Sequence, residues 1–517
     1  MLGKTSPNRF AAIHVGSEQV SVHIVEYTTI QDIKVVEMAS RHVALGEETF
    51  KTGRISFAAV GEICELLKGY RRMFAEHGVR DYRLVATTAI REAENQQYII
   101  DQIQVKTGFI VEVCDMPQEI FIKYAALFKT VQDRNLLEAE NAILFVDISS
   151  GGLGITLYKD GELKYQQNIH IGVLRIKEGF AQYQRDSAHF QQALAEYIYS
   201  VIEPVQQALN KQDIRYLVLS GTETRLLLTM LGQENPGKLS LVSLADFYKL
   251  YDQVKLLNLP QIVQNFGFSE QKAEMVLPTI ILYKQILNLT TVGQILIPDT
   301  QLIDGITLLH IGEKTKQEWL LALENQTLSL ARGICCKYQY DPSHAASVEK
   351  LSLSLFDRLT RIHGLGKRER LLLQAAAILH DIGKFVSLRS HYFYSYRLIR
   401  SSDILGFSEA EKNIMANIAL YHSKGVPANT DPNLQGLTPK QRVIIAKLAA
   451  IIRLADALDR THRQKINSYE IALKGDELFI TVTTQEDYSL EEWTFLDKAT
   501  FFEDVFGIAA ILRRRAG

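Results

Sequence analysis

Two segments of the chain share one pattern of hydrophobic and polar residues. Residues 10–27 (FAAIHVGSEQVSVHIVEY) and residues 142–161 (AILFVDISSGGLGITLYKDG) alternate apolar and polar positions on both sides of a short polar turn. Such alternation predicts two strands joined by a turn in each segment. The two segments align with His14 opposite Asp147 and with the turns opposite one another. We therefore expect a duplicated unit and two similar lobes.

The stretches that follow each predicted hairpin alternate between helical and strand patterns. Residues 57–77 and 119–131 are helix-like, whereas residues 82–87 and 216–219 are short apolar runs typical of strands. Alternation of this kind is typical of layered α/β structures. The first part of the chain is therefore predicted to belong to the α/β class.

The pattern changes after about residue 312. A polar stretch (GEKTKQE) precedes a helix-rich region over residues 343–462, and residues 468–484 (SYEIALKGDELFITVTT) predict a hairpin around a Lys-Gly-Asp turn. We expect an all-α domain and a small α+β appendage after the two lobes. The predicted divisions are lobe I over residues 1–135, lobe II over 136–312, a linker over 313–335, the helical domain over 336–462 and the appendage over 463–517.

Composition narrows the class of protein. A chain of 517 residues with 47% hydrophobic and 22% charged residues is globular and too long for one core, so three or four domains are expected. The N-terminal residues lack the apolar core of a signal peptide, and no stretch approaches the roughly 20 apolar residues of a membrane span. We expect a cytoplasmic protein without a membrane partner.

Charge gives little general attraction to polyanions. The net charge of −2 favours neither nucleic acid nor anionic lipid as a partner. A polyanionic substrate would need a local basic patch, for which Arg397, Arg400 and residues 513–515 are candidates. The four cysteines lack CxxC spacing and are interpreted as reduced thiols without a chemical role.

Three turns rich in glycine, serine and threonine are candidates for phosphate binding. They are VGSE with Gly16 and Ser17, DISSGG with Ser149, Ser150, Gly151 and Gly152, and LSGTET with Gly221 and Thr222. Small residues let backbone N–H groups approach phosphate oxygens closely, and nearby carboxylates can hold a divalent ion. One such turn is more often a plain loop, so the prediction depends on the three together.

A second candidate site lies in the helix-rich region. His380 and Asp381 end the apolar stretch LLLQAAAILHD, His344 begins another predicted helix, and Asp456 lies in RLADALDR. This set resembles the ligands of HD-type metal phosphohydrolases, and its nitrogen and oxygen atoms suit Mn, Fe, Mg or Zn. The alternative is a set of capping or surface residues in a vestigial pocket.

The other histidines of this region are interpreted in two ways. His391 and His422 lie where HD-type domains often carry histidine for a second metal or a phosphate, so they are accessory candidates. His363 and His462 have neighbours that supply turn and cap chemistry, and we interpret them as loop and helix-end residues rather than ligands.

The chain resembles the Ppx/GppA phosphatase family along nearly its whole length. The matching segments are IHVGS, ATTAIREAEN, PQEIFIKYAAL, VDISSGG, SGTET, KAEMVLPTIIL and IDGITLL, in the order and spacing of the family. The resemblance implies two actin-like (ribonuclease H-like) lobes, an HD-type helical domain, and a homodimer with a long basic channel. It also implies hydrolysis of inorganic polyphosphate or guanosine pentaphosphate with Mg²⁺ or Mn²⁺.

The same resemblance implies roles for residues of the cleft between the lobes. Asp147 would bind the metal, Glu119 would activate the attacking water, and Arg91 would face phosphate. Two of the turns, with Ser149, Ser150, Gly151, Gly152, Gly221 and Thr222, would cradle that phosphate.

Three acidic residues of the family pattern are replaced in this chain. The first aspartate of the family is His14, the first glutamate of its Glu-Glu pair is Gln118, and the last glutamate of its DIGGGSTE loop is Gly154. Carboxylates hold Mg²⁺ and accept the proton of attacking water, so their loss should weaken both functions.

Three functions remain open from the sequence. The first is an exopolyphosphatase that releases terminal orthophosphate in the cleft between the lobes. In the second, the helical domain hydrolyses a phosphoester and the lobes only bind. The third is a sensor of polyphosphate or an alarmone in which neither site catalyses a reaction.

Overall fold

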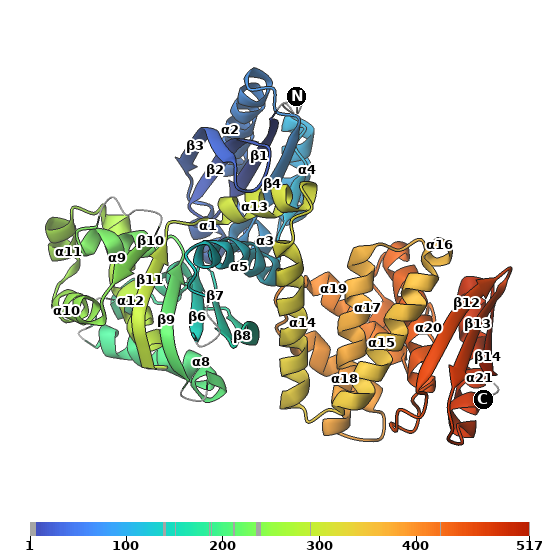
Figure 1. The fold of residues 1–517 in the computed structure, drawn as a ribbon. Coiled ribbons are helices and arrows are strands. Elements are labelled where there is room, and N and C mark those ends of the chain that lie inside the picture. The colour runs from blue at the N-terminus through green and yellow to red at the C-terminus, as the bar shows by residue number, and fades with distance from the viewer. Residues whose placement is uncertain are drawn as a thin grey trace, which may run out of the picture. The chain divides into compact units, whose positions relative to one another are not determined.

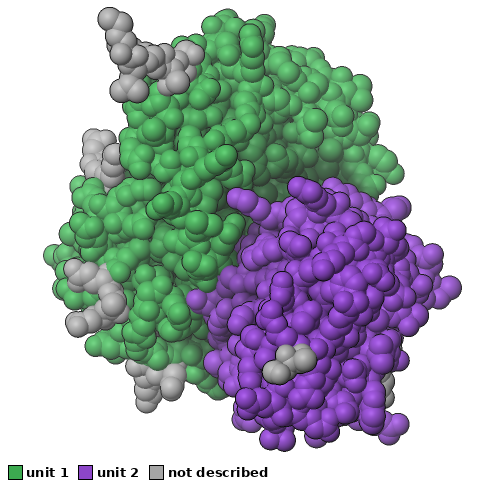
Figure 2. All heavy atoms as spheres, turned by 45° about the vertical axis from the view of Figure 1, so that its right-hand side comes forward, with its two compact units in different colours: residues 1–327 green, residues 328–517 purple. Residues whose placement is uncertain are grey.

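The fold was examined in a computed structural model (Figure 1). It describes residues 7–137, 141–149, 151–185, 187, 189–209, 212–233, 239–289, 291–423 and 425–515. The chain forms two compact units, residues 1–327 and residues 328–517, which are coloured separately in Figure 2. Among the described residues, no helix is long and apolar enough to cross a membrane.

The first unit begins with a five-stranded sheet in the order β3-β2-β1-β4-β5. Strands β1 and β2 form the first predicted hairpin, and β1 pairs in parallel with β4. The strands are β1 (Asn8–Val15), β2 (Gln19–Tyr27), β3 (Ile33–His42), β4 (Asp81–Ala86) and β5 (Val111–Val113). The helices of this lobe are α1 (Leu45–Thr52), α2 (Phe57–Glu76), α3 (Thr88–Glu92) and α4 (Gln96–Thr107).

A second sheet repeats the same topology. Its order is β10-β11-β9-β6-β7-β8, so that β8, β7, β6, β9 and β11 correspond to the five strands of the first sheet. Here β6 and β7 form the second predicted hairpin, and β6 pairs in parallel with β9. The strands are β6 (Ile143–Ile148), β7 (Leu153–Lys159), β8 (Glu162–Ile169), β9 (Asp213–Ser220), β10 (Leu239–Val242) and β11 (Thr291–Pro298). The predicted α/β duplication is confirmed.

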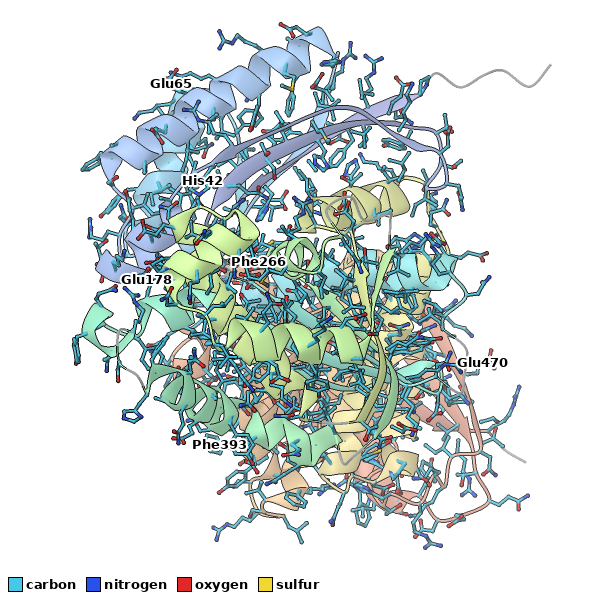
Figure 3. All side chains as sticks on the ribbon, turned by 90° about the vertical axis from the view of Figure 1, so that its left-hand side faces the viewer. His42, Glu65, Glu178, Phe266, Phe393 and Glu470 are labelled. Carbon is cyan, nitrogen blue, oxygen red and sulfur yellow. The ribbon has the colours of Figure 1, made fainter. Side chains whose placement is uncertain are left out.

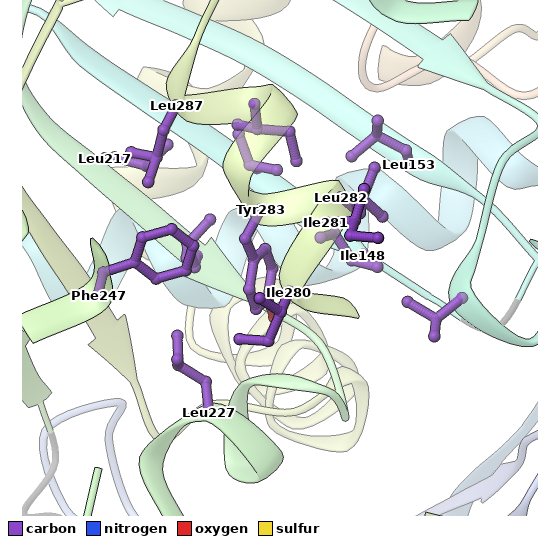
Figure 4. Close-up of a cluster of buried hydrophobic side chains, with 14 of the residues drawn as sticks. Ile148, Leu153, Leu217, Leu227, Phe247, Ile280, Ile281, Leu282, Tyr283 and Leu287 are labelled. Carbon is purple, nitrogen blue, oxygen red and sulfur yellow. The ribbon is translucent and has the colours of Figure 1, made fainter. Parts of the chain in front are cut away.

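Helices cover the second sheet because its central strands are apolar on both faces. All six residues of β6 are buried, as expected of a strand with a layer on either side. In Figure 4 the ring of Tyr283 lies among Leu227, Phe247 and Ile280 in the resulting core. The helices are α5 (Met116–Asp133), α6 (Val173–Glu178), α7 (Gln182–Arg185), α8 (Phe190–Leu209), α9 (Thr224–Met230), α10 (Leu244–Val254), α11 (Leu259–Phe266) and α12 (Glu270–Leu287).

The segment after β11 returns to the first sheet. Helix α13 (Leu302–Lys314) packs against β1 and α5, and the ring of its His310 stacks on Phe10 with centroids 3.8 Å apart. A Cβ atom at Gly305 would lie 2.1 Å from the carbonyl oxygen of Ile122, so glycine permits this close helix packing. Residues 302–312, predicted as part of lobe II, therefore lie against lobe I.

The predicted linker over residues 313–335 is largely helical. Helix α14 (Trp319–Lys337) occupies most of it, and the division between the two compact units falls inside this helix, after Thr327. Its apolar residues Leu323, Leu328 and Ala331 are buried. Leu323 shares one helical face with the buried Trp319 and Leu330, at spacings of four and seven residues, and the polar stretch before them obscures this pattern in the sequence.

The second unit contains helices followed by a small sheet. The helices are α15 (Pro342–Arg358), α16 (Thr360–His363), α17 (Lys367–Leu379), α18 (His391–Ser401), α19 (Glu409–Tyr421), α20 (Pro439–Ala457) and α21 (Ser489–Phe506), with 3₁₀ turns η1 (Ile382–Phe385) and η2 (Pro432–Leu434). The sheet contains β12 (Ser468–Lys474), β13 (Glu477–Thr483) and β14 (Ala509–Arg514). Strands β12 and β13 form the predicted hairpin, and α21 packs against both α20 and β14.

Candidate functional sites

A cavity of about 590 Å³ opens between the two sheets of the first unit. It lies where β1, β6 and β9 end, which is where ligands usually bind in sheets with parallel strands. His42, labelled in Figure 3 at the end of β3, also contributes to its wall. The predicted residues that line this cavity are Ser17, Asp147, Gly221 and Thr222.

Duplication places His14 and Asp147 at equivalent points. Each is the second-to-last residue of its strand, and each lines the cavity. Asp147 is paired with Ser220 of the neighbouring strand, and the Ser220 hydroxyl donates a hydrogen bond of 2.7 Å to its Oδ1 atom. The carboxylate is therefore held at the strand end by the sheet itself.

Lys123 is a site residue that the sequence interpretation missed. It lies on α5, and its Nζ atom is 3.0 Å from Oδ2 of Asp147 and 3.5 Å from Oε1 of Glu119. Burial alone would lower the pKa of Lys123, but the Asp147 and Glu119 carboxylates outweigh burial and hold it above its usual range. A charged ammonium group therefore joins the two carboxylates. Only its spacing of four residues from Glu119 could have indicated this contact.

Glu119 and Arg91 are paired with one another. Nη1 of Arg91 lies 2.9 Å from Oε2 of Glu119 and also donates to the carbonyl oxygen of Cys114. Burial would raise the pKa of Glu119, but Lys123 and Arg91 outweigh burial and lower it. Glu119 is 5% exposed, and neither it nor Arg91 is among the residues that line the cavity. In this structure the two residues form a buried ion pair behind Lys123.

The three residues that depart from the family pattern have structural roles here. His14 Nε2 lies 3.1 Å from Oγ1 of Thr87, and burial lowers the pKa of His14 to about 4, so the ring is neutral at pH 7. Gln118 completes a capping box with Asp115 at the start of α5. A Cβ atom at Gly154 would lie 2.9 Å from Cδ1 of Ile120, so a side chain has little room there.

The turn after β6 is closed by its own hydrogen bonds. The backbone N–H of Ser149 donates to the carbonyl of Gly152, and the N–H of Gly152 donates to the Ser149 hydroxyl. Gly151 packs against Thr88, and none of these three turn residues is among those that line the cavity. Ser150 lies outside the described residues.

The other two turns meet the cavity only in part. The N–H of Gly16 donates within its own turn to Gln19, whereas Ser17 faces the cavity. Gly221 has a φ of +124°, and a Cβ atom there would lie 1.9 Å from the carbonyl oxygen of Ile148. Only glycine therefore allows the turns after β9 and β6 to approach this closely.

Glu223 is the second cavity residue that the sequence interpretation missed. It is 2% exposed, its Oε2 atom accepts a hydrogen bond from Thr222, and its Oε1 atom is buried without a hydrogen-bond partner among the described residues. Burial, followed by the Glu18 carboxylate, raises the pKa of Glu223 to about 7. Its position inside the SGTET turn was the feature of the sequence that could have identified it as a cavity residue. A carboxylate with such a pKa exchanges protons readily at neutral pH.

The cleft does not fit a divalent metal ion. Both oxygens of Asp147 already accept hydrogen bonds, from Ser220 and Lys123, and both oxygens of Glu119 face Arg91 or Lys123. A divalent ion beside these carboxylates would also lie close to the Lys123 ammonium group, and repulsion between the two cations would offset the attraction of the carboxylates. The expectation that Asp147 binds a metal is therefore not supported by its surroundings.

The four predicted ligands of the second unit come together in one buried pocket. His344 Nε2 lies 3.3 Å from both His380 Nε2 and Oδ1 of Asp456, and 3.7 Å from Oδ2 of Asp381. These residues come from α15, from the end of α17 and from α20. Three sets of potential metal ligands among the described residues all belong to this cluster.

Hydrogen bonds behind the rings turn the histidines inward. Nδ1 of His380 donates to the carbonyl of Ala377 over 2.7 Å, and Nδ1 of His422 donates to the carbonyl of Ala419 over 2.6 Å. Nδ1 of His344 lies 2.9 Å from Oδ2 of Asp459, a buried residue that sequence reasoning missed. The Nε2 atom of each ring is thereby directed into the pocket, as in metal sites whose ligands are oriented by a second partner.

The accessory histidines lie on the far side of Asp381. His391 Nε2 is 3.3 Å from Oδ1 of Asp381, and His422 Nε2 is 3.6 Å from the same atom. His462, which we interpreted as a helix-end residue, instead stacks on His344 with ring centroids 3.6 Å apart. It is held there by Lys384 and Asp341 because the chain turns back after α20. The spacing of Asp459, three residues after Asp456, was the sequence signal that further residues of this segment lie behind His344.

This pocket fits a divalent ion. Burial lowers the pKa of His380 to about 3, so that its ring is neutral and able to bind a metal. Burial opposes protonation of His344, but hydrogen bonds to Asp456 and Asp459 outweigh it and raise its pKa to about 9. A metal ion would replace that proton as the partner of the carboxylates. Two histidines and two aspartates provide the mixed nitrogen and oxygen donors that Mn, Fe or Zn prefer.

Comparison with known proteins agrees with both units. Residues 23–311 match the model of the Ppx/GppA phosphatase family, and residues 329–499 match the model of Ppx/GppA phosphatase, domain III. Guanosine-5'-triphosphate,3'-diphosphate pyrophosphatase of Aeromonas hydrophila is 23% identical over 478 residues, which are 92% of each chain. The protein of that name from Vibrio vulnificus is 20% identical over 482 residues, again 92% of each chain.

Solved structures share the fold of part of the chain. An exopolyphosphatase from Cytophaga hutchinsonii aligns with a TM-score of 0.53 and 22% identity over 59% of this chain and 98% of that one. A Ppx/GppA family member from Aquifex aeolicus aligns with a TM-score of 0.51 and 20% identity over 60% of this chain and 99% of that one. With family models matching both units, the chain belongs to the Ppx/GppA phosphatase family, whose members are phosphoanhydride hydrolases.

Proposed function

We propose that the chain hydrolyses the terminal phosphoanhydride bond of guanosine pentaphosphate or inorganic polyphosphate in the cleft of residues 1–327. The observation that carries this proposal is Glu223, a buried carboxylate at the wall of a cavity that also contains Ser17, Gly221 and Lys123; one of its oxygens has no hydrogen-bond partner among the described residues. A cavity of about 590 Å³ is large enough for a nucleotide.

Each part of the reaction has a residue in this cleft. The Gly221–Thr222 turn and Ser17 hold the terminal phosphate through hydrogen bonds, and the Lys123 ammonium group faces its charge. Glu223 accepts the proton of the attacking water at Oε1, for which its pKa of about 7 is suited. Glu119 and Arg91 hold Lys123 and the start of α5 in position. Orthophosphate is the product.

The lining favours a nucleotide over a long polyphosphate chain. Cations and anions are mixed around the cavity, with Lys177 paired to Glu274 and Arg225 paired to Asp299. A long polyanion requires a continuous basic groove. The ring of Phe268 gives one wall on which a base can stack. The names of the Aeromonas and Vibrio relatives agree with a guanosine substrate.

Phosphate release tests this proposal. Initial rates would be measured with guanosine pentaphosphate and with long-chain polyphosphate for the natural chain, for Glu223→Gln and for Glu47→Gln, a control at the same cavity. We expect the natural chain to prefer the nucleotide and Glu223→Gln to lose about 100-fold or more in rate. Equal loss in both variants, or no release from either substrate by the natural chain, would contradict the proposal.

A second candidate function is favoured by the convergence of ligands in the second unit. His344, His380, Asp381 and Asp456 would hold a divalent metal, which when bound supplies Lewis-acid activation of water. His391 and His422 lie beside Asp381, where they can bind a phosphate group. In this alternative the helical unit hydrolyses a phosphoester and the cleft only binds.

A further inference from the structure

We propose that the ammonium group of Lys123 takes the place of a divalent cation in the cleft, where it excludes a metal ion and supplies the positive charge for the terminal phosphate. This inference rests on the proposed function for its phosphate and deepens it, because it names what balances the charge of the substrate. The exclusion of a metal ion by Lys123 does not depend on which substrate the cleft binds.

Lys123 lies where a metal ion would have to lie. Its Nζ atom lies 3.0 Å from Asp147 and 3.5 Å from Glu119, and the residue lines the cavity. A metal ion that joined these carboxylates to a phosphate would have to lie at the same point. The protein thus holds the ammonium group, and 14% of the Lys123 side chain is exposed at the cavity wall.

The described residues of the cleft offer too few oxygen ligands for a divalent metal ion. His14 is bonded to Thr87, Gln118 is used in a helix cap, and Gly154 faces Ile120 with little room for a side chain. Asp147 and Glu119 each have a further partner, Ser220 for Asp147 and Arg91 for Glu119, so of the described carboxylates near Lys123 only Glu223 keeps an oxygen without a hydrogen-bond partner. Magnesium usually takes about six oxygen ligands in near-octahedral geometry, which this set does not offer.

Lys123 has hydrogen-bonding capacity left for a phosphate. An ammonium group has three N–H donors. Two of them face Asp147 and Glu119, so the third is left for a phosphate oxygen. Lysine is a common phosphate ligand in proteins and acts as a point charge. The cluster of Lys123, Arg91, Asp147 and Glu119 is neutral overall, so a phosphate is not repelled by it.

Binding of Mn²⁺ tests whether the cleft excludes a metal. The double change His380→Ala, Asp381→Ala removes the pocket of the second unit, and paramagnetic resonance then counts the Mn²⁺ ions bound to the rest of the chain. We expect no tightly bound ion, and only weak binding of one ion per chain after the further change Lys123→Met frees the two carboxylates from the ammonium group. A tightly bound ion that disappears with Asp147→Asn while Lys123 is present would overturn the proposal.

Nucleotide binding tests the charge that Lys123 supplies. Affinity for guanosine 5′-triphosphate 3′-diphosphate would be measured by calorimetry in EDTA and in Mg²⁺, with Glu223→Gln in every variant to prevent turnover. We expect EDTA to change Kd by less than about twofold, and Lys123→Met to weaken binding in EDTA by about tenfold or more. Lys123→Arg should retain binding because it keeps the charge.

Lys129→Met is the matched control. Lys129 lies on the same helix and pairs with Asp133 four residues later, away from the cavity. It should leave Kd unchanged, and thermal unfolding should show that all variants are folded. Binding that needs Mg²⁺, or equal binding by Lys123→Met in EDTA, would overturn the role of Lys123. Absence of binding in both buffers would overturn that role together with the proposed function, whereas Mn²⁺ in the cleft would overturn metal exclusion alone.

Discussion

Nη1 of Arg91 lies 2.9 Å from Oε2 of Glu119, so two residues with expected roles in phosphate binding and water activation form a buried ion pair. Arg91 also bonds to Thr88 of its own helix α3 and to the carbonyl of Cys114, which fixes α3 against the end of β5 and the start of α5. This pair is therefore a structural element of the cleft wall. Loss of activity on changing either residue has to be separated from loss of stability.

We expect Glu119→Ala to lower the free energy of unfolding by about 3 kcal/mol, because it leaves Arg91 and Lys123 with uncompensated charge in a buried site. The measurement is denaturant unfolding monitored by circular dichroism. Glu65→Ala is the control, since Glu65 forms an exposed pair with Lys68 whose loss should leave the free energy of unfolding nearly unchanged. Equal stability of the two variants would show that Arg91 and Glu119 are not coupled.

The activity of the cleft should depend on the protonation of Glu223. A base must be deprotonated, and the pKa of Glu223 is raised to about 7 by burial and then by Glu18, with Lys123 acting in the opposite direction. We expect kcat/KM to rise with pH through about 7 and to level off above it. This limb should disappear from the residual activity of Glu223→Gln. A profile without a limb between pH 5 and 9 would exclude Glu223 as the base.

The same carboxylate should make stability dependent on pH. Because its folded pKa of about 7 lies above the value of 4.5 in an unfolded chain, the folded state holds the proton more tightly between these pH values. The stabilisation is fully present below about pH 4.5 and is lost as the pH rises through about 7. Glu223→Gln should therefore gain stability relative to the natural chain between pH 5 and 8, by up to about 3 kcal/mol. A difference that is independent of pH would contradict the raised pKa.

Metal binding by the second unit can be followed without an enzyme assay. Mn²⁺ at about 100 times its Kd should stabilise the folded chain by about 2.7 kcal/mol and so raise Tm. The double change His380→Ala, Asp381→Ala should abolish this rise. His363→Ala is the control, because His363 is buried but bonds to the carbonyl of Phe356 outside the pocket. His363→Ala should lower the Tm measured without metal but keep the increase in Tm on adding Mn²⁺. If Mn²⁺ did not raise the Tm of His363→Ala, the assigned ligands would be wrong.

The sequence was sufficient for features that depend on local patterns. The two hairpins and the helices around His344 and His380 could be predicted because each is encoded in a short continuous segment, and the family could be predicted from seven such segments in order along the chain. The return of α13 to the first sheet could not, since it depends on packing between Gly305 and Ile122, which are far apart in the chain.

The chemistry of the cleft was the least predictable part. Lys123 and Glu223 lie in segments that match the family, but their roles follow from side chains that the fold brings together, such as Asp147 and Glu18. His462 was assigned to a helix end because its neighbours suggested a turn, whereas the fold stacks it on His344. Asp459 could have been found from its spacing of three residues after Asp456.

The measurement that tests the central claim most directly is phosphate release from guanosine pentaphosphate by three proteins: the natural chain, Glu223→Gln, and the double change His380→Ala, Asp381→Ala. We predict that Glu223→Gln loses about 100-fold or more in rate and that the double variant keeps the rate of the natural chain. Loss in the double variant with full activity in Glu223→Gln would contradict catalysis in the cleft and assign it to the helical unit.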